Sequence, residues 1–127
     1  MNDERRSTNG KSVHDLRKRT KGFALRILRL YATLPRTTEV QVVGKQLLRS
    51  GTSVGAHYRE AYRARSTAEF VSKLESGLQE LEETTYWLEL LVDGGLVAKD
   101  RLRKLFQEAE ELTAILVASV KTAKRQS

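Results

Sequence analysis

The sequence predicts an all-α fold, an antiparallel up-down-up-down bundle of four helices. Apolar residues recur at three- and four-residue steps through four long segments, which is the period of an amphipathic helix. No segment alternates convincingly between apolar and polar residues as a strand does. The connections are short, and short connections force consecutive helices to lie antiparallel. We expect one domain over residues 12–124, with helices at about 12–34, 38–65, 67–92 and 98–122.

The first two helices are separated at a proline. An apolar stripe runs from Leu16 to Leu34, and the polar residues 1–11 before it predict a disordered tail. Pro35 ends the first helix because proline disfavours helical geometry in the residue before it. Thr38 and Gln41 then match the capping box S/T-x-x-E/Q, which predicts that the second helix begins here.

A second capping box and a glycine pair delimit the third helix. Ser66 and Glu69 fit the box, and Gly94-Gly95 ends the helix because glycine accepts the left-handed geometry of a helix C-terminus. The fourth helix contains LTAILVASV, residues 112–120, which is apolar almost all round. A bundle helix needs only one apolar stripe, so this surplus predicts a second buried contact and therefore a homo-oligomer.

The composition argues against several kinds of site. The 127 residues include no cysteine, which removes disulfides and thiol chemistry, and only two histidines. A di-iron bundle site needs paired Glu-x-x-His motifs, and neither His14 nor His57 has a glutamate three residues before it. We therefore expect no metal and no cofactor. There is no apolar run of about 18 residues and no apolar signal core, so we expect a cytoplasmic protein without a membrane partner.

The net charge of +7 is unevenly distributed. Residues 1–65 carry 15 Lys and Arg against 5 Asp and Glu, whereas residues 66–127 carry 8 against 11. A basic half attracts polyanions such as RNA or DNA, and the alternative is a merely solvated surface. Tyr31, Tyr58 and Tyr62 are either base-stacking residues or core. The candidate nucleic-acid-binding residues are Arg17, Lys18, Arg19, Lys21, Arg26, Arg29, Arg59, Arg63 and Arg65.

The stretch Gly51-Thr52-Ser53-Val54-Gly55 fits G-x-S-x-G, the nucleophile elbow of serine hydrolases. An elbow needs a strand before the serine, but the residues before Ser53 keep a helical period. We therefore expect no catalytic residue here and no enzymatic activity. Glycine in a helix costs about 1 kcal/mol relative to alanine, which is tolerated where a neighbour must come close. The predicted close-packing positions are Gly51, Gly55 and, as their counterpart on the third helix, Gly77.

Polar residues of the second and third helices are expected to meet. The two helices turn near Ser66, so residues whose numbers sum to about 133 lie level. This aligns Glu60 with Lys73, Ser53 with Glu80, and Arg49 with Glu83 or Thr84. The alternatives are a carboxylate site and a structural layer that fixes the register, and we favour the layer. Its predicted members are Arg49, Ser53, His57, Glu60, Lys73, Glu80 and Glu83.

The run QLLRSGTSVGAHYREA, residues 46–61, resembles the four-helix-bundle family named after the protein encoded in 23S ribosomal RNA intervening sequences. Ser66, Phe70, Lys73 and Leu74 match a following S-x-x-x-F-x-x-K-L segment, and residues 83–91 match a helix ending in E-T-x-Y-W-L-E-L-L. The resemblance covers roughly residues 20–120. The departure is His57, where the family pattern has asparagine.

The resemblance implies a homopentameric bundle with no known enzymatic activity. The family is similar, more distantly, to the accessory protein of diversity-generating retroelements, which binds nucleic acid and a reverse transcriptase. Two functions therefore stay open. One is nucleic-acid binding through the basic surface with little sequence preference, and the other is a protein adaptor whose partner docks on an acidic or apolar surface.

Overall fold

The computed structural model of the chain contains four α-helices. They are α1 (Asn2–Thr33), α2 (Thr38–Tyr62), α3 (Thr67–Asp93) and α4 (Lys99–Gln126). The structure describes the backbone of residues 2–126 and the side chains of residues 16–126. Residues 2–126 form no strand, so the all-α prediction is confirmed. The expected disordered tail, residues 1–11, and His14 lie outside the described side chains.

The helix boundaries follow local backbone chemistry. Ser66 caps α3 by accepting a hydrogen bond from the Glu69 N–H at 3.1 Å, as the capping box predicts. After α3, Gly95 takes a φ of +74°, the left-handed conformation expected of the glycine pair. The second helix ends at Tyr62 rather than near residue 65, because the chain must become extended at Ser66 before α3 begins.

The capping box predicted at Thr38 is wrong. The N-cap of α2 is Thr37, and its side chain makes no capping hydrogen bond. Gln41, the expected reciprocal partner, instead ties the preceding connection. Its side-chain amide donates to the Pro35 carbonyl at 2.9 Å, and its oxygen accepts from the Tyr31 hydroxyl at 2.8 Å. The Gln41 side chain therefore fastens the start of α2 to the end of α1.

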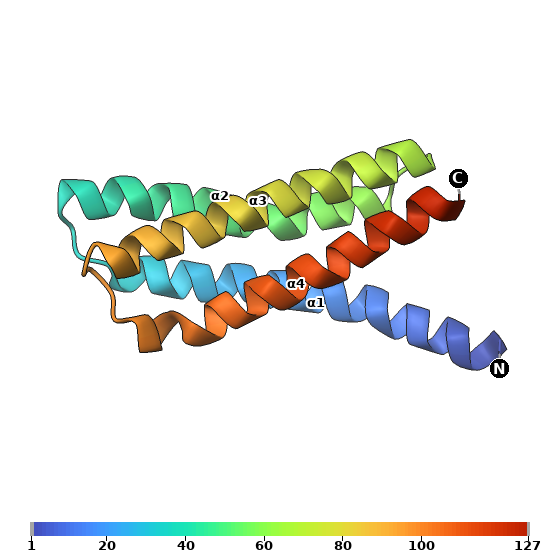
Figure 1. Cartoon of the computed structure of the whole chain (residues 1–127), viewed down its shortest axis with the longest axis horizontal. Coiled ribbons are helices and arrows are strands. Elements are labelled where there is room, and N and C mark those ends of the chain that lie inside the picture. Colours follow the sequence, from blue (N-terminus) through green and yellow to red (C-terminus); the bar gives the residue numbers. More distant parts are fainter. Residues whose placement is uncertain (1, 127) are drawn as a thin grey trace.

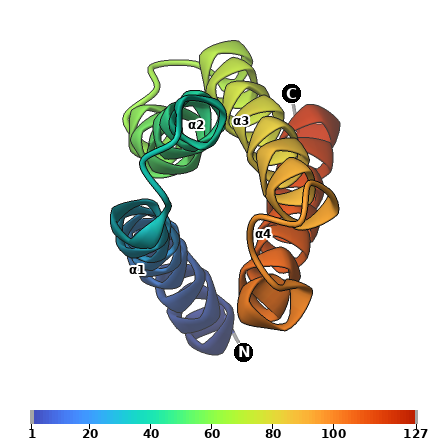
Figure 2. The same ribbon diagram turned by 90° about the vertical axis from the view of Figure 1, so that its left-hand side faces the viewer.

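The chain reverses direction at each of its three connections, so the four helices lie alongside one another (Figure 1). Viewed end on, the helices follow one another around a ring in the order α1, α2, α3 and α4 (Figure 2). The contact between α2 and α3 is the most extensive, and that between α1 and α4 is the least. In this view α1 and α2 lie on one side of the ring and α3 and α4 on the other, so the α1/α2 and α3/α4 faces point in different directions (Figure 2).

The centre of the ring is filled by aliphatic and aromatic side chains from all four helices. Burying each such side chain contributes about 1.5–3 kcal/mol. Fully buried examples are Phe23 and Ile27 from α1, Leu47 and Val54 from α2, Leu81 and Leu88 from α3, and Leu112 and Leu116 from α4. In the segment 112–120, Ile115 and Val117 are only half-buried and Ala114 and Ala118 are not in the core. Part of that apolar surplus therefore faces outward.

The glycines of α2 pack against α1. A Cβ added at Gly51 would lie 2.8 Å from Cγ1 of Ile27, and one at Gly55 would lie 3.1 Å from Oγ1 of Thr20. The counterpart proposed on the third helix is wrong, because an added Cβ at Gly77 meets only ordinary contacts of 3.8–3.9 Å. Gly51 and Gly55 face α1, whereas Gly77 faces His57 and Leu116. The close approach is therefore between α1 and α2.

Candidate nucleic-acid interface

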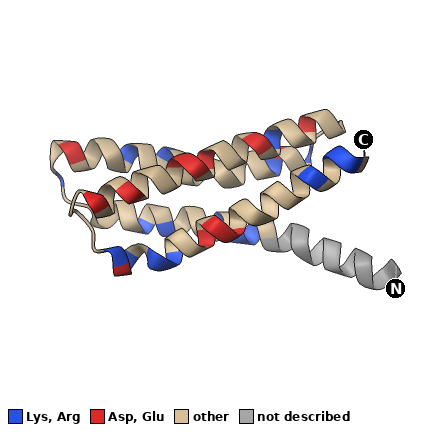
Figure 3. Cartoon of the chain, viewed as in Figure 1, with Lys and Arg blue, Asp and Glu red and all other residues tan. Residues whose placement is uncertain are grey.

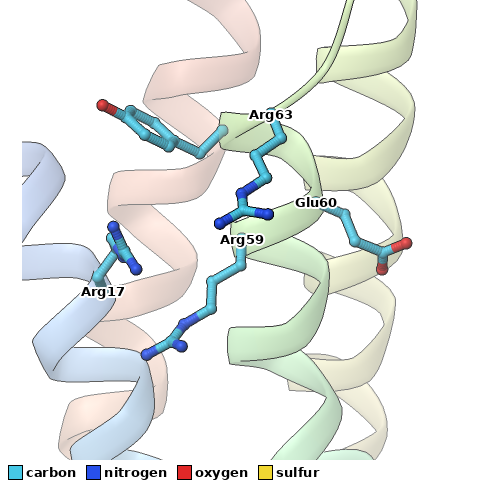
Figure 4. Close-up of a pocket in the computed structure, with 5 residues that line it drawn as sticks. Arg17, Arg59, Glu60 and Arg63 are labelled. Atoms are coloured by element: carbon cyan, nitrogen blue, oxygen red, sulfur yellow. The ribbon is translucent and has the colours of Figure 1, made fainter.

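Three arginines meet at one end of the α1/α2 face. Arg17 of α1 and Arg59 and Arg63, one turn apart at the end of α2, line a pocket of about 350 Å³ together with Tyr62 and Glu60. We call this the arginine pocket (Figure 4). Within the described side chains, none of its three guanidinium groups takes part in a hydrogen bond or ion pair. The pocket therefore presents three positive charges free to bind an anion.

The acidic residue of the arginine pocket is turned away from it. Figure 4 shows the Glu60 side chain pointing to the opposite side from Arg17 and Arg59. Its carboxylate accepts a hydrogen bond from Lys73 Nζ at 3.2 Å and lies 3.2 Å from His57 Nδ1. The hydrogen bond from Lys73 holds the pKa of Glu60 below its usual value. Glu60 therefore pairs with Lys73 of α3 and does not neutralise the arginines of the pocket.

A second hollow, of about 310 Å³, continues from the arginine pocket along α1 and α2. Arg59 lines both hollows, and Lys21 adds a further cation to the second. Its walls are otherwise small, with Ala24, Gly55 and Ala56 among them. The two hollows form a basic strip between the helices, which we call the α1/α2 groove. Among the residues that line the two hollows, Glu60 is the only acid, against the cations Arg17, Lys21, Arg59 and Arg63.

The remaining predicted basic residues are dispersed. Arg26 and Arg29 line a separate hollow against Asp100 and Arg101 of α4. Lys18 and Arg65 are exposed outside both hollows of the groove. The structure therefore divides the nine predicted residues into a groove set and scattered surface cations. The groove set is Arg17, Lys21, Arg59 and Arg63.

Arg19 connects two helices of the bundle and does not line the α1/α2 groove. Its guanidinium binds Glu108 at 2.6 and 3.0 Å and Glu111 at 2.9 Å, so it connects α1 to α4. This bidentate pairing neutralises its charge within the chain. The prediction that Arg19 belongs with the other basic residues in binding nucleic acid is not supported by this placement.

The predicted polar layer lies between α2 and α3. Lys73 binds Glu60, and Arg49 binds Glu83 at 2.5 Å and Glu80 at 3.2 Å. The hydrogen bond from Arg49 lowers the pKa of Glu83, and the same bond raises the pKa of Arg49. The imidazole of His57 lies between two carboxylates, with Nε2 3.7 Å from Glu80 and Nδ1 near Glu60. The layer is half-exposed rather than buried.

Ser53, which was expected to lie level with Glu80, forms its hydrogen bond within α2. Its hydroxyl donates to the Arg49 carbonyl of its own helix at 2.6 Å. The stretch GTSVG lies within α2, so Ser53 occupies no strand-to-helix elbow. The G-x-S-x-G sequence therefore lies within a helix, as its helical period predicted, and its two glycines pack on α1.

The fully buried polar contact between α2 and α3 was not predicted. The hydroxyls of Ser50 and Thr84 lie 2.9 Å apart, and both residues are completely buried. Each hydroxyl also lies near a carbonyl of its own helix. The signal was present, because the numbers 50 and 84 sum to 134 and each residue interrupts an apolar stripe. The contact fixes the register of the two helices.

The third helix has the opposite charge, because residues 67–93 carry seven Asp and Glu against Lys73 alone. Figure 3 shows acidic residues spaced along α3. A hollow of about 560 Å³ between α3 and α4 has Leu78, Tyr86 and Val117 in its lining and Glu82 and Glu89 beside them. No His, Asp and Glu side chains among residues 16–126 gather in a group of three that would hold a metal ion. In the described part of the chain, no helix is long and apolar enough to cross a membrane.

Comparison with known proteins agrees with this architecture. A family model described as "23S rRNA-intervening sequence protein" matches residues 14–118. A crystal structure from Bacteroides thetaiotaomicron VPI-5482, of a protein with unknown function from the S23 ribosomal protein family, is similar with a TM-score of 0.81. Its identity is 37%, and the match covers 86% of this chain and 97% of that chain. A comparison with curated proteins found no match.

Proposed function

This chain belongs to the family of 23S rRNA-intervening sequence proteins, and from that premise we propose that it is a non-enzymatic nucleic-acid-binding protein of the cytoplasm. It binds RNA or DNA through the α1/α2 groove with little sequence preference. The observation that carries the proposal is the arginine pocket, in which Arg17, Arg59 and Arg63 lack an ion-pair partner among the described side chains. Arginine binds phosphate through two parallel hydrogen bonds, and phosphate contacts position a nucleic acid without reading its bases.

Titration of labelled RNA and DNA at 50 and 200 mM salt tests this function. Phosphate binding weakens steeply with salt, by roughly 20- to 50-fold over this range for three to four contacts on a single strand. Replacing Arg59, Arg63 and Arg65 with glutamine should weaken binding to all sequences about equally. The proposal fails if the protein binds neither RNA nor DNA at 50 mM salt, or if its binding does not change with salt.

We also propose that the four helices form an antiparallel up-down-up-down bundle and that copies of it assemble into a homo-oligomer, a pentamer by family resemblance. Outward-facing apolar residues support assembly. Leu25 and Leu28 of α1 are exposed, and the α3/α4 hollow contains Leu78 and Val117. Burying such residues between copies removes apolar surface from water. Light scattering that finds a monomer at micromolar concentration contradicts the assembly.

A protein adaptor is the second candidate, and the α3/α4 hollow favours it. Tyr86 is exposed there between Glu82 and Glu89, an arrangement that suits an apolar contact surrounded by basic residues of a partner. Docking driven mainly by apolar burial depends little on salt. The salt titration therefore separates the two candidates.

A further inference from the structure

We infer that the arginine pocket binds one nucleotide of a single strand, holding its phosphate with the three guanidinium groups and stacking its base on Tyr62. This inference rests on the proposed nucleic-acid function and names the site and the form of nucleic acid that it takes. The pocket volume of about 350 Å³ lies at the lower end of small-ligand sites, which is room for one nucleotide.

The phosphate is assigned to the arginines because of their position and their lack of partners. Arg17 reaches the pocket from α1, and Arg59 and Arg63 reach it from α2, so an anion between the helices meets donors from two sides (Figure 4). The planar guanidinium group suits phosphate oxygens, to which it donates two hydrogen bonds. By contrast, Arg19 and Arg49 are already held by carboxylates of the chain.

The base is assigned to Tyr62 because the other two candidate tyrosines are engaged elsewhere. Tyr58 is buried, and that burial raises the pKa of its phenol. Tyr31 is half-buried and its hydroxyl donates to Gln41. Tyr62 lines the arginine pocket and is 54% exposed, so its ring is accessible to a ligand. Aromatic rings stack on unpaired bases whatever the sequence.

A duplex does not satisfy this arrangement. Its bases are stacked within the helix, so they do not reach a ring at the side of a phosphate site. A single strand turns its bases outward, and its next phosphate follows along the chain. The second hollow of the groove begins at Arg59 and leads to Lys21, which supplies a cation for that phosphate. The groove is thus expected to prefer single strands of either sugar type.

The test measures the binding of fluorescein-labelled U12, dT12 and a GC-rich 12-base-pair RNA hairpin duplex at 50 and 200 mM salt by fluorescence anisotropy. Arg59→Gln with Arg63→Gln should weaken single-strand binding more than tenfold. It should also reduce the salt slope by about 0.7 for each phosphate that the variant no longer binds. The matched control is Arg26→Gln with Arg29→Gln, which removes the same charge from the hollow beside Asp100. We expect less than a threefold change for that control.

Substitutions at Tyr62 test base stacking separately, because they leave the charge of the arginine pocket unchanged. Tyr62→Leu should weaken U12 and dT12 binding about tenfold, in the range measured for base stacking, and leave duplex binding unchanged. Tyr62→Phe should retain binding because it keeps the ring. Tyr86→Leu is the control, since Tyr86 is 52% exposed but lies beside Glu82 and Glu89 in the α3/α4 hollow. Circular dichroism melting of each variant verifies that the bundle is intact.

The outcomes separate this inference from the proposed function. If the wild-type protein binds but both arginine pairs cause equal losses, or Tyr62→Leu has no effect, the pocket assignment is wrong and the function stands. Equal binding of duplex and single strands also overturns the assignment. If the wild-type protein binds none of the three probes, the nucleic-acid function itself is wrong. Oligo-glutamate bound as tightly as U12 would show a general polyanion site and would likewise overturn the inference.

Discussion

Because α2 packs closely on α1 at Gly51, the structure predicts a different effect of Gly51→Ala on stability from the one that helix propensity alone predicts. Replacing a helical glycine with alanine raises helix propensity by about 1 kcal/mol. At Gly51 the added Cβ would lie 2.8 Å from Cγ1 and 3.0 Å from Cγ2 of Ile27, closer than carbon atoms pack. Ile27 is completely buried, and its β-branched side chain has little rotamer freedom with which to move away. We therefore expect the steric cost of Gly51→Ala to cancel or exceed the gain in helix propensity.

The magnitude follows from comparing Gly51→Ala with Gly77→Ala. Both glycines are buried in helix interiors, so both substitutions gain the same propensity of about 1 kcal/mol. An added Cβ at Gly77 makes only ordinary contacts, so this variant should keep the gain. Overpacking at Gly51 costs about 1–3 kcal/mol, which is the expected difference in the free energy of unfolding between the two variants.

Urea denaturation at one fixed protein concentration measures this difference, because oligomer stability depends on concentration. A double variant locates its cause. Ile27→Ala removes both contacting γ-carbons, so Gly51→Ala should cost less in that background than in the wild type. Equal stability of Gly51→Ala and Gly77→Ala would refute the assigned close packing. A fully additive double variant would show that Ile27 is not the obstructing residue.

Three further predictions concern α2 and its contact with α3. Thr84→Val and Ser50→Ala should each lower the free energy of unfolding by about 1 kcal/mol in urea, and a double variant whose effects are additive would contradict their hydrogen bond. Arg49→Gln should be less stable than wild type at pH 7, because Arg49 lowers the pKa of Glu83 in the folded state. A lowered carboxyl pKa contributes stability that is present above the unfolded value of about 4.3 and is lost as the pH falls through the lower folded value, so the difference should shrink on acidification, and a difference as large at pH 3 as at pH 7 would refute the pairing. Ser53→Ala should leave nucleic-acid binding unchanged, and labelling of Ser53 by a fluorophosphonate probe would overturn its structural role.

Helix type and many boundaries could be predicted because they depend on nearby residues. The spacing of apolar side chains, Pro35, the Ser66 cap and the Gly94-Gly95 pair act within a few residues of the chain. The failure at Thr38 has a different origin. Gln41 takes partners in the connection before α2, and this tertiary contact displaces the local capping box.

Contacts between helices could be predicted only where a turn defines the register. The α2–α3 turn places Glu60 near Lys73 and Arg49 near Glu83, as its residue numbers suggest. Register does not specify side-chain reach. The short hydroxyl of Ser53 bonds to its own helix, and the longer Arg49 side chain takes Glu80 instead.

The contacts between α1 and α4, which close the ring, could not be predicted from the sequence pattern. Arg19 meets Glu108 across 89 residues, and no turn relates α1 directly to α4. The same limit explains Gly77, since periodicity assigns a residue to a helix face but not to a particular neighbour. The sequence identified Gly51 and Gly55 as close-packing positions, and the structure shows that they face α1 instead of α3.

The packing of α2 on α1 links the fold to the proposed binding site. Gly55 admits Thr20 of α1 to within close contact and also lines the second hollow of the groove. Bringing the two helices together in this way sets Arg17 and Arg59 on either side of one pocket, although neither arginine is needed for the helices to pack. Arg19, which lies between the groove residues Arg17 and Lys21 in the sequence, instead forms its ion pairs with Glu108 and Glu111 of α4. Variants of Gly55 should therefore disturb both stability and binding, whereas variants of Arg59 and Arg63 should affect binding alone. That contrast is what distinguishes a binding surface from a structural one.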